Sequence, residues 1–159
     1  MSELSSENSF NKGLQAVLRG QYLEALAYFE ASMELVQRAG NGQAPVKYLS
    51  YYGLCLAMAS ARLREAREIC ERAVEAEFYN PDLYLNLGKV YLKGRDRARA
   101  FGALIRGLQL NPRHAGIICE ISHLGIRKRP VLPFLDRSHP LNRVLGRLRR
   151  SAPRDLSVH

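Results

Sequence analysis

Residues 81–112 hold the pattern that most constrains how this chain can fold. The first half of this stretch repeats aromatic, apolar and small residues on one helical face, namely Tyr84, Leu87, Gly88 and Tyr91. A glycine inside a helix costs roughly 1 kcal/mol relative to alanine. Gly88 therefore indicates a position where the missing side chain lets a second helix approach closely.

The second half of the stretch predicts that partner helix, over about residues 97–110. Ala100, Leu104 and Gly107 form its inner face, and Asn111-Pro112 is a helix stop signal. A pair of short antiparallel helices cannot bury its apolar faces alone, so such pairs have to stack on neighbours. The alternative is one ordinary amphipathic hairpin, and further copies of the pattern argue against it.

Two further copies precede this pair in the sequence. The middle copy has Gly53 on its first helix and Ala66 on its second, and Ala66 lies 34 residues before Ala100. The first copy has Ala25 on its second helix, 41 residues before Ala66, and its first helix matches the pattern less well. A loop at residues 39–45, rich in glycine and ending in proline, accounts for the longer interval.

This spacing resembles the tetratricopeptide repeat (TPR), whose period is 34 residues. The resemblance covers about residues 7–126 and implies an all-α superhelix of about three helical hairpins. Ile118, Ile121 and Gly125 then predict a capping helix of the kind that terminal repeats need. We therefore assign residues 1–126 to the superhelix with its capping helix.

The start of the chain is polar and acidic, unlike a basic and apolar signal peptide. Ser5 or Ser6 is the predicted N-cap of the first helix, which we expect to run to about Leu18. No apolar run approaches the roughly 20 residues that a membrane-spanning helix needs. We expect a cytoplasmic protein.

Residues 127–159 are predicted to form a basic tail that is bent by prolines. Pro130 and Pro133 exclude a regular helix around them, whereas Ser138 and Pro140 predict the start of an amphipathic helix. Its apolar face holds Leu141, Val144, Leu145 and Leu148, and its basic face holds Arg143, Arg147, Arg149 and Arg150. This helix either packs on the capping helix or is free to bind an anionic membrane or nucleic acid.

The charge of the chain is uneven along its length. The net charge is +9, but residues 1–44 carry three basic and five acidic side chains, and residues 113–159 carry ten and three. No aromatic side chains alternate with the arginines of the tail to stack on bases. Any binding of nucleic acid by the tail is therefore expected to be weak, electrostatic and indifferent to sequence.

The cysteines and histidines offer little chemistry. Cys55, Cys70 and Cys119 are odd in number and lie in predicted helices, so we expect reduced thiols in the core or the groove rather than disulfides. Cys119 and His123 share a helical face with His114 nearby, which is an incomplete set of ligands for a soft metal. Packing is the favoured interpretation, and we predict no metal site and no cofactor.

No sequence motif for catalysis is present. The chain lacks a Gly-rich phosphate loop, a Gly-x-Ser-x-Gly elbow, a metalloprotease helix and a Cys-x-x-Cys pair. We therefore expect no enzyme and no small-molecule substrate. The TPR resemblance instead implies a non-enzymatic module that binds a peptide or helical segment of another protein.

The resemblance also implies where that segment binds, in a concave groove lined by the first helix of each pair. The residues at these positions are Phe10, Leu14, Val17, Lys47, Ser50, Leu54, Asp82, Leu85, Lys89, Leu92, Lys93 and His123. Such a groove is apolar toward its N-terminal end and basic toward its C-terminal end. It suits a partner with apolar and acidic groups. The alternative for Lys89 and Lys93 is that they form a solvated face.

Three other functions are compatible with parts of the sequence. TPR proteins that clamp the C-terminal carboxylates of chaperones need Lys and Asn on the first helix, where this chain has Phe10 and Leu14. An adaptor attached to anionic membrane or nucleic acid would depend on the tail. A secretion chaperone resembles the chain in size and in its three repeats, but such chaperones are typically acidic. The partner-binding module remains the leading hypothesis.

Overall fold

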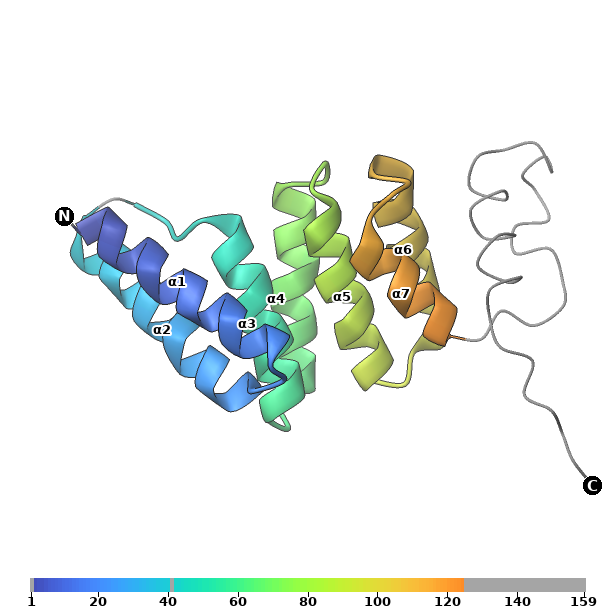
Figure 1. The fold of residues 1–159 in the computed structure, drawn as a ribbon, viewed down its shortest axis with the longest axis horizontal. Coiled ribbons are helices and arrows are strands. Elements are labelled where there is room, and N and C mark those ends of the chain that lie inside the picture. Colours follow the sequence, from blue (N-terminus) through green and yellow to red (C-terminus); the bar gives the residue numbers. More distant parts are fainter. Residues whose placement is uncertain (1, 41, 125–159) are drawn as a thin grey trace, which may run out of the picture.

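The fold is an array of helices that follow one another along the long axis of the molecule (Figure 1). A computed structural model describes residues 2–40 and 42–124. Within these residues it contains helices and no strands, as the sequence predicts. The helices are α1 (Ser2–Leu18), α2 (Tyr22–Arg38), α3 (Val46–Ala59), α4 (Leu63–Ala76), α5 (Pro81–Lys93), α6 (Arg97–Leu110) and α7 (Ala115–His123).

Consecutive helices form three hairpins, α1–α2, α3–α4 and α5–α6, and α7 packs against the last of them. Helix α3 contacts α5, and α5 contacts α7, so these first helices form one layer. Helices α2, α4 and α6 pack against α1, α3 and α5, respectively. We call α1, α3, α5 and α7 the first helices and α2, α4 and α6 the second helices.

A glycine on the first helix of each hairpin receives a side chain from the second helix of that hairpin. A Cβ atom built at Gly13 would lie 2.5 Å from Phe29, one at Gly53 would lie 2.7 Å from the Cys70 sulfur, and one at Gly88 would lie 2.7 Å from Leu104. Each of these contacts lies four residues after a fully buried alanine of the second helix: Ala25, Ala66 and Ala100. The predicted role of Gly88 in close helix packing is confirmed, and it recurs in every hairpin.

The buried side chains form three clusters along the array. An aromatic cluster joins α1, α2 and α3 around Phe10, Phe29 and Tyr48. An aliphatic cluster follows around Leu54 and Leu87, and a third one joins α6 to α7. Because the first two clusters each contain residues of neighbouring hairpins and the third joins the last hairpin to α7, every hairpin packs against a neighbour, as such pairs require.

The first helix begins earlier than predicted. Helix α1 starts at Ser2, so neither Ser5 nor Ser6 is its N-cap. Ser6 is only 4% exposed, and its side chain is hydrogen-bonded to Tyr48 of α3. The hydroxyl that we assigned to capping instead joins α1 to the next hairpin.

Polar side chains cap the later helices. The side chains of Asn80, Asp96 and His114 accept hydrogen bonds from backbone N–H groups in the first turns of α5, α6 and α7. Helices α2, α3 and α4 have no such side-chain bond. Since a good N-cap contributes about 1 kcal/mol, the C-terminal part of the array has the better-defined helix starts.

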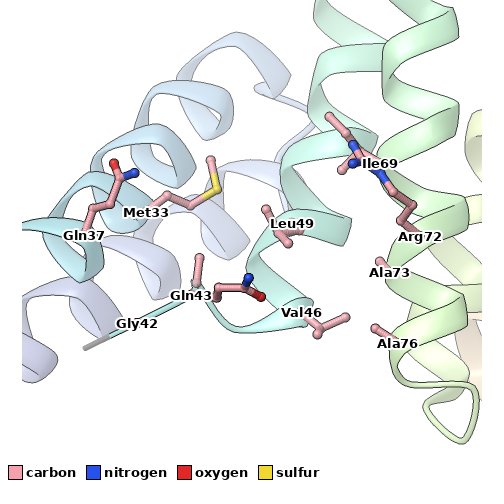
Figure 2. Close-up of a pocket in the computed structure, with 11 residues that line it drawn as sticks. Met33, Gln37, Gly42, Gln43, Val46, Leu49, Ile69, Arg72, Ala73 and Ala76 are labelled. Carbon is pink, nitrogen blue, oxygen red and sulfur yellow. The ribbon is translucent and has the colours of Figure 1, made fainter. Parts of the chain in front are cut away.

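The predicted break at residues 39–45 is an extended connection between the first and second hairpins. Gly40 and Gly42 adopt positive φ values of 68° and 83°, a region that favours glycine. The loop carries the chain from the end of α2 to the start of α3, and it lies beside the gap between α2 and α4 (Figure 2).

Candidate functional site

The N-terminal half of the predicted groove is buried. Phe10, Ser50 and Leu54 are 3%, 0% and 1% exposed, so they have no surface with which to contact a ligand, contrary to the prediction. The ring of Phe10 stacks on Tyr48 at 4.2 Å between centroids, and it meets Tyr51 edge-on. The aromatic cluster therefore fills the place where a groove was expected.

The other predicted residues at this end support the same cluster. Leu14 and Val17 are half-buried and pack against it. Lys47 is exposed, but its Nζ lies 5.2 Å from the centroid of Phe10 and 5.7 Å from that of Tyr48. In this cation–π geometry the ammonium group of Lys47 covers the stacked rings of Phe10 and Tyr48.

Ser50 has a structural partner on the next hairpin. The Asn86 amide donates a hydrogen bond of 3.1 Å to the Ser50 hydroxyl, and both residues are buried. The Ser50 carbonyl also accepts from the Cys70 thiol. An asparagine among the apolar residues of α5 was the sequence signal for this link, because a buried amide needs a partner.

The C-terminal half of the predicted groove remains accessible. Leu85 and Leu92 are half-buried on α5, Lys93 is exposed at its end, and His123 is exposed on α7. The Lys89 ammonium lies 3.6 Å from the Glu120 carboxylate of α7, and the two side chains are 27% and 24% exposed. We call Leu85, Lys89, Leu92, Lys93 and His123 the α5–α7 face.

A histidine connects the two helices of this face. The His114 Nδ1 accepts a hydrogen bond from the Ile117 N–H at the start of α7, and its Nε2 lies 2.8 Å from the Asp82 carboxylate of α5. Asp82, which we predicted as a groove residue, is exposed but occupied by this pairing. The histidine ties α7 to the first turn of α5.

The suggested metal ligands do not form a site. Cys119 Sγ and His123 Nε2 lie 4.0 Å apart, and His114 is committed to Asp82. Among the described residues, no three His, Cys, Asp or Glu side chains converge. Cys119 is a free thiol that is exposed on α7, so it lies outside the core.

The other two cysteines are packed thiols. Cys55 and Cys70 are fully buried, and their burial raises the pKa of each thiol to about 12. A thiol with so high a pKa is protonated at neutral pH and is a poor nucleophile. Neither residue is suited to catalysis or to metal binding.

The described part of the chain also has a cavity between the second helices α2 and α4. It has a volume of about 690 Å³, and Figure 2 shows α2 on one side, α4 on the other and residues 42–49 between them. Its lining is Met33, Gln37, Gly42, Gln43, Ala44, Val46, Leu49, Ile69, Arg72, Ala73 and Ala76. The sequence analysis missed this cavity, although the long 39–45 loop that separates α2 from α4 was a visible signal.

The tail lies outside the described residues. The basic tail residues Arg143, Arg147, Arg149 and Arg150, and the boundary at residue 126, are therefore not placed by the structure. None of the described helices combines the length and the hydropathy that a membrane span requires.

Comparison with known proteins identifies the fold. No protein-family model matches the chain, and a search of curated proteins finds no significant match. Among solved structures, the TPR domain of Arabidopsis OM64 is similar over 78% of this chain and 97% of its own, with a TM-score of 0.58 and 18% identity. The TPR protein YrrB is similar over 73% of this chain and 56% of its own, with a TM-score of 0.55 and 22% identity. The three stacked hairpins with their buried Gly and Ala contacts, closed by α7, thus have the fold of TPR domains.

Proposed function

We propose that the chain is a binding module that holds a segment of another protein on the α5–α7 face. The observation that carries this proposal is the pairing of apolar and cationic groups on one accessible surface. Leu92 is only half-buried there, and Lys93 forms no ion pair with any described residue. Leu85 is half-buried as well, with part of its side chain packed against the α6–α7 cluster. A segment with apolar side chains and a carboxylate complements such a surface.

The rigidity of the surface favours binding. Helix α5 is capped by Asn80, and α7 is tied to it by the His114–Asp82 and Lys89–Glu120 contacts. Because these helices are ordered before a partner arrives, little conformational entropy is lost in arranging the contact residues. YrrB, which has the same type of fold, is described as having an unusual peptide-binding site, which is consistent with this use of the fold.

The proposed surface is smaller than the groove expected from the sequence. It excludes Phe10, Ser50 and Leu54, which are buried, and it excludes Leu14 and Val17, which pack on the aromatic cluster. The partner segment is thus expected to contact α5 and α7 and to leave α1 free. The predicted carboxylate of the partner would lie near Lys93.

A site-specific photo-crosslinker tests this placement. We would replace Leu92 by p-benzoylphenylalanine in the full-length chain in cells and identify the crosslinked protein. The same replacement at Leu23, an exposed leucine of α2, is the matched control. We expect a defined adduct from position 92 and none from position 23.

A charge reversal then tests the chemistry. Lys93→Glu is expected to lower the yield of the position-92 adduct about tenfold, because the carboxylate of the partner segment would lose the ammonium group that pairs with it. Lys12→Glu, the same change on exposed α1, is expected to leave the yield unchanged. Equal adducts from positions 92 and 23, or a yield that is unaffected by Lys93→Glu, would overturn the proposal.

A further inference from the structure

The three second helices differ sharply in charge. Helix α2 carries three glutamates and one arginine, and α4 carries four glutamates and three arginines. Helix α6 carries three arginines and no acidic residue. The second helices thus change from acidic to basic along the array, and α6 is the basic end.

The charges of α6 are concentrated on its outer face. Arg99 and Arg106 are exposed and seven residues apart, which is about 10 Å along a helix, and Arg113 follows at the same spacing just beyond the helix end. Arg99 pairs with Asp96, the residue that caps the helix. Arg106 and Arg113 form no ion pair with any residue that the structure describes.

Gly102 lies between Arg99 and Arg106, and no close packing contact explains why this position is a glycine. A Cβ atom added at Gly102 would have nothing within 4 Å. A Cβ at any of the other glycines inside described helices, Gly13, Gly53, Gly88, Gly107 and Gly116, would approach a neighbour to 2.8 Å or less. Gly102 destabilises α6 by roughly 1 kcal/mol relative to alanine, and no close contact within the described structure offsets this cost.

We propose that the outer face of α6 docks an acidic α-helix of a partner protein, with the backbone of α6 at Gly102 as the point of closest approach. Ala98 lies one turn before Gly102 and is also exposed, so the two leave a shallow notch with arginines on its flank. Small residues let two helices approach closely, and flanking arginines would pair with carboxylates of the incoming helix.

Charge argues against the rest of this chain as the occupant. Residues 125–159 carry nine basic and two acidic side chains, so they would be repelled by the arginines. A nucleic-acid duplex would be attracted to the same arginines, but long arginine side chains reach phosphates without a notch in the helix. The exposed glycine therefore favours a helix over a phosphate backbone, and a DNA duplex serves as the competing ligand in the test.

The test measures binding of two defined probes to the full-length chain by fluorescence anisotropy. The first probe is a synthetic 21-residue helical peptide with alanine along one face and glutamate on both flanks of that face. The second probe is a 20-base-pair DNA duplex. Because every variant keeps residues 125–159, any contribution of that basic segment is the same in all of them.

Two variants separate charge from shape. Arg106→Glu is expected to weaken peptide binding about tenfold or more, whereas Arg64→Glu, the matched change on exposed α4, leaves it unchanged. Gly102→Leu is expected to weaken peptide binding to a similar extent while the melting temperature stays equal or rises, because leucine favours helix and Gly102 is exposed with open space around an added Cβ atom. Lys93→Glu should not affect this binding, which distinguishes it from the α5–α7 face.

Several outcomes would overturn the proposal. One is a peptide that does not bind, or that binds Arg64→Glu as weakly as Arg106→Glu. Another is peptide binding that is insensitive to Gly102→Leu, since the notch would then have no role. A third is a duplex that binds more tightly than the peptide and is weakened by Arg106→Glu, which would assign the surface to nucleic acid instead.

Discussion

The first and third hairpins fill the space between their helices with different side chains. In the first, Phe29 of α2 lies over Gly13 of α1, and its ring belongs to an aromatic cluster with Phe10 and Tyr51. Bulk therefore fills the space between the helices. A long loop joins this hairpin to the next one, and no side chain caps the start of α2.

The third hairpin has a closely packed glycine on each of its two helices. A Cβ at Gly88 would meet Leu104, and a Cβ at Gly107 would lie 2.6 Å from Ile117 and 2.9 Å from the Cβ of Tyr84. The side chains of Asn80 and Asp96 cap the starts of α5 and α6. The comparison teaches that the helical-hairpin pattern specifies complementary volumes rather than particular residues, so each hairpin should fail in its own way.

The largest effect is expected from removing bulk in the first hairpin. Phe29→Ala leaves a cavity in the aromatic cluster, and we expect the free energy of unfolding to fall by about 3–5 kcal/mol. Leu23→Ala on the same helix, where the leucine is 73% exposed, should change stability by less than about 0.5 kcal/mol. Urea denaturation followed by circular dichroism measures both. A loss below about 1 kcal/mol for Phe29→Ala would contradict the role assigned to this ring.

A smaller effect is expected from adding bulk in the third hairpin. Gly107→Ala forces a methyl group against Tyr84 and Ile117, and overpacking of about 1–3 kcal/mol outweighs the helix propensity gained. Gly102→Ala is the matched control on the same helix. It gains the propensity without a clash and should stabilise the chain by up to about 1 kcal/mol. If both variants shift the melting temperature in the same direction, the close-packing account of Gly107 is wrong.

The smallest effect concerns pH and the junction of the first two hairpins. Burial, followed by the charges of Asp82 and Cys55, raises the pKa of Tyr51 to about 12. The folded state therefore favours the neutral phenol. The resulting contribution of Tyr51 to the free energy of unfolding is complete below pH 10 and is lost as the pH rises toward 12. At pH 11 the wild type should lose about 1 kcal/mol more stability than Tyr51→Phe, relative to pH 9. Parallel stability curves for the two proteins would exclude this contribution.

The sequence predicted the fold well because its evidence is local. Gly88, Ala100 and the stop at Asn111-Pro112 are specific to close helix packing and helix ends, and the structure places all of them as expected. Spacing along a helix determines which side faces the partner helix. The N-cap at Ser5 or Ser6 was mispredicted because the side chain of Ser6 is bonded to Tyr48, a residue far away in the sequence.

The binding face was harder to predict because exposure depends on neighbouring hairpins. Ser50 and Leu54 occupy the helix positions that are accessible on α5, but α3 is covered on both sides. Phe10 follows the same helical register and is covered by Tyr48. Position within one repeat cannot report how closely the next repeat packs. The cavity beside the 39–45 loop was missed for the same reason, since it lies between hairpins.

The position of His114 fixes where its proton resides. Because Nδ1 accepts from the Ile117 N–H, the neutral ring must carry its hydrogen on Nε2, which then donates to the Asp82 carboxylate. The tautomer of one imidazole thus couples the start of the last helix to the surface on which we place the partner, and ring nitrogen chemical shifts would report it directly.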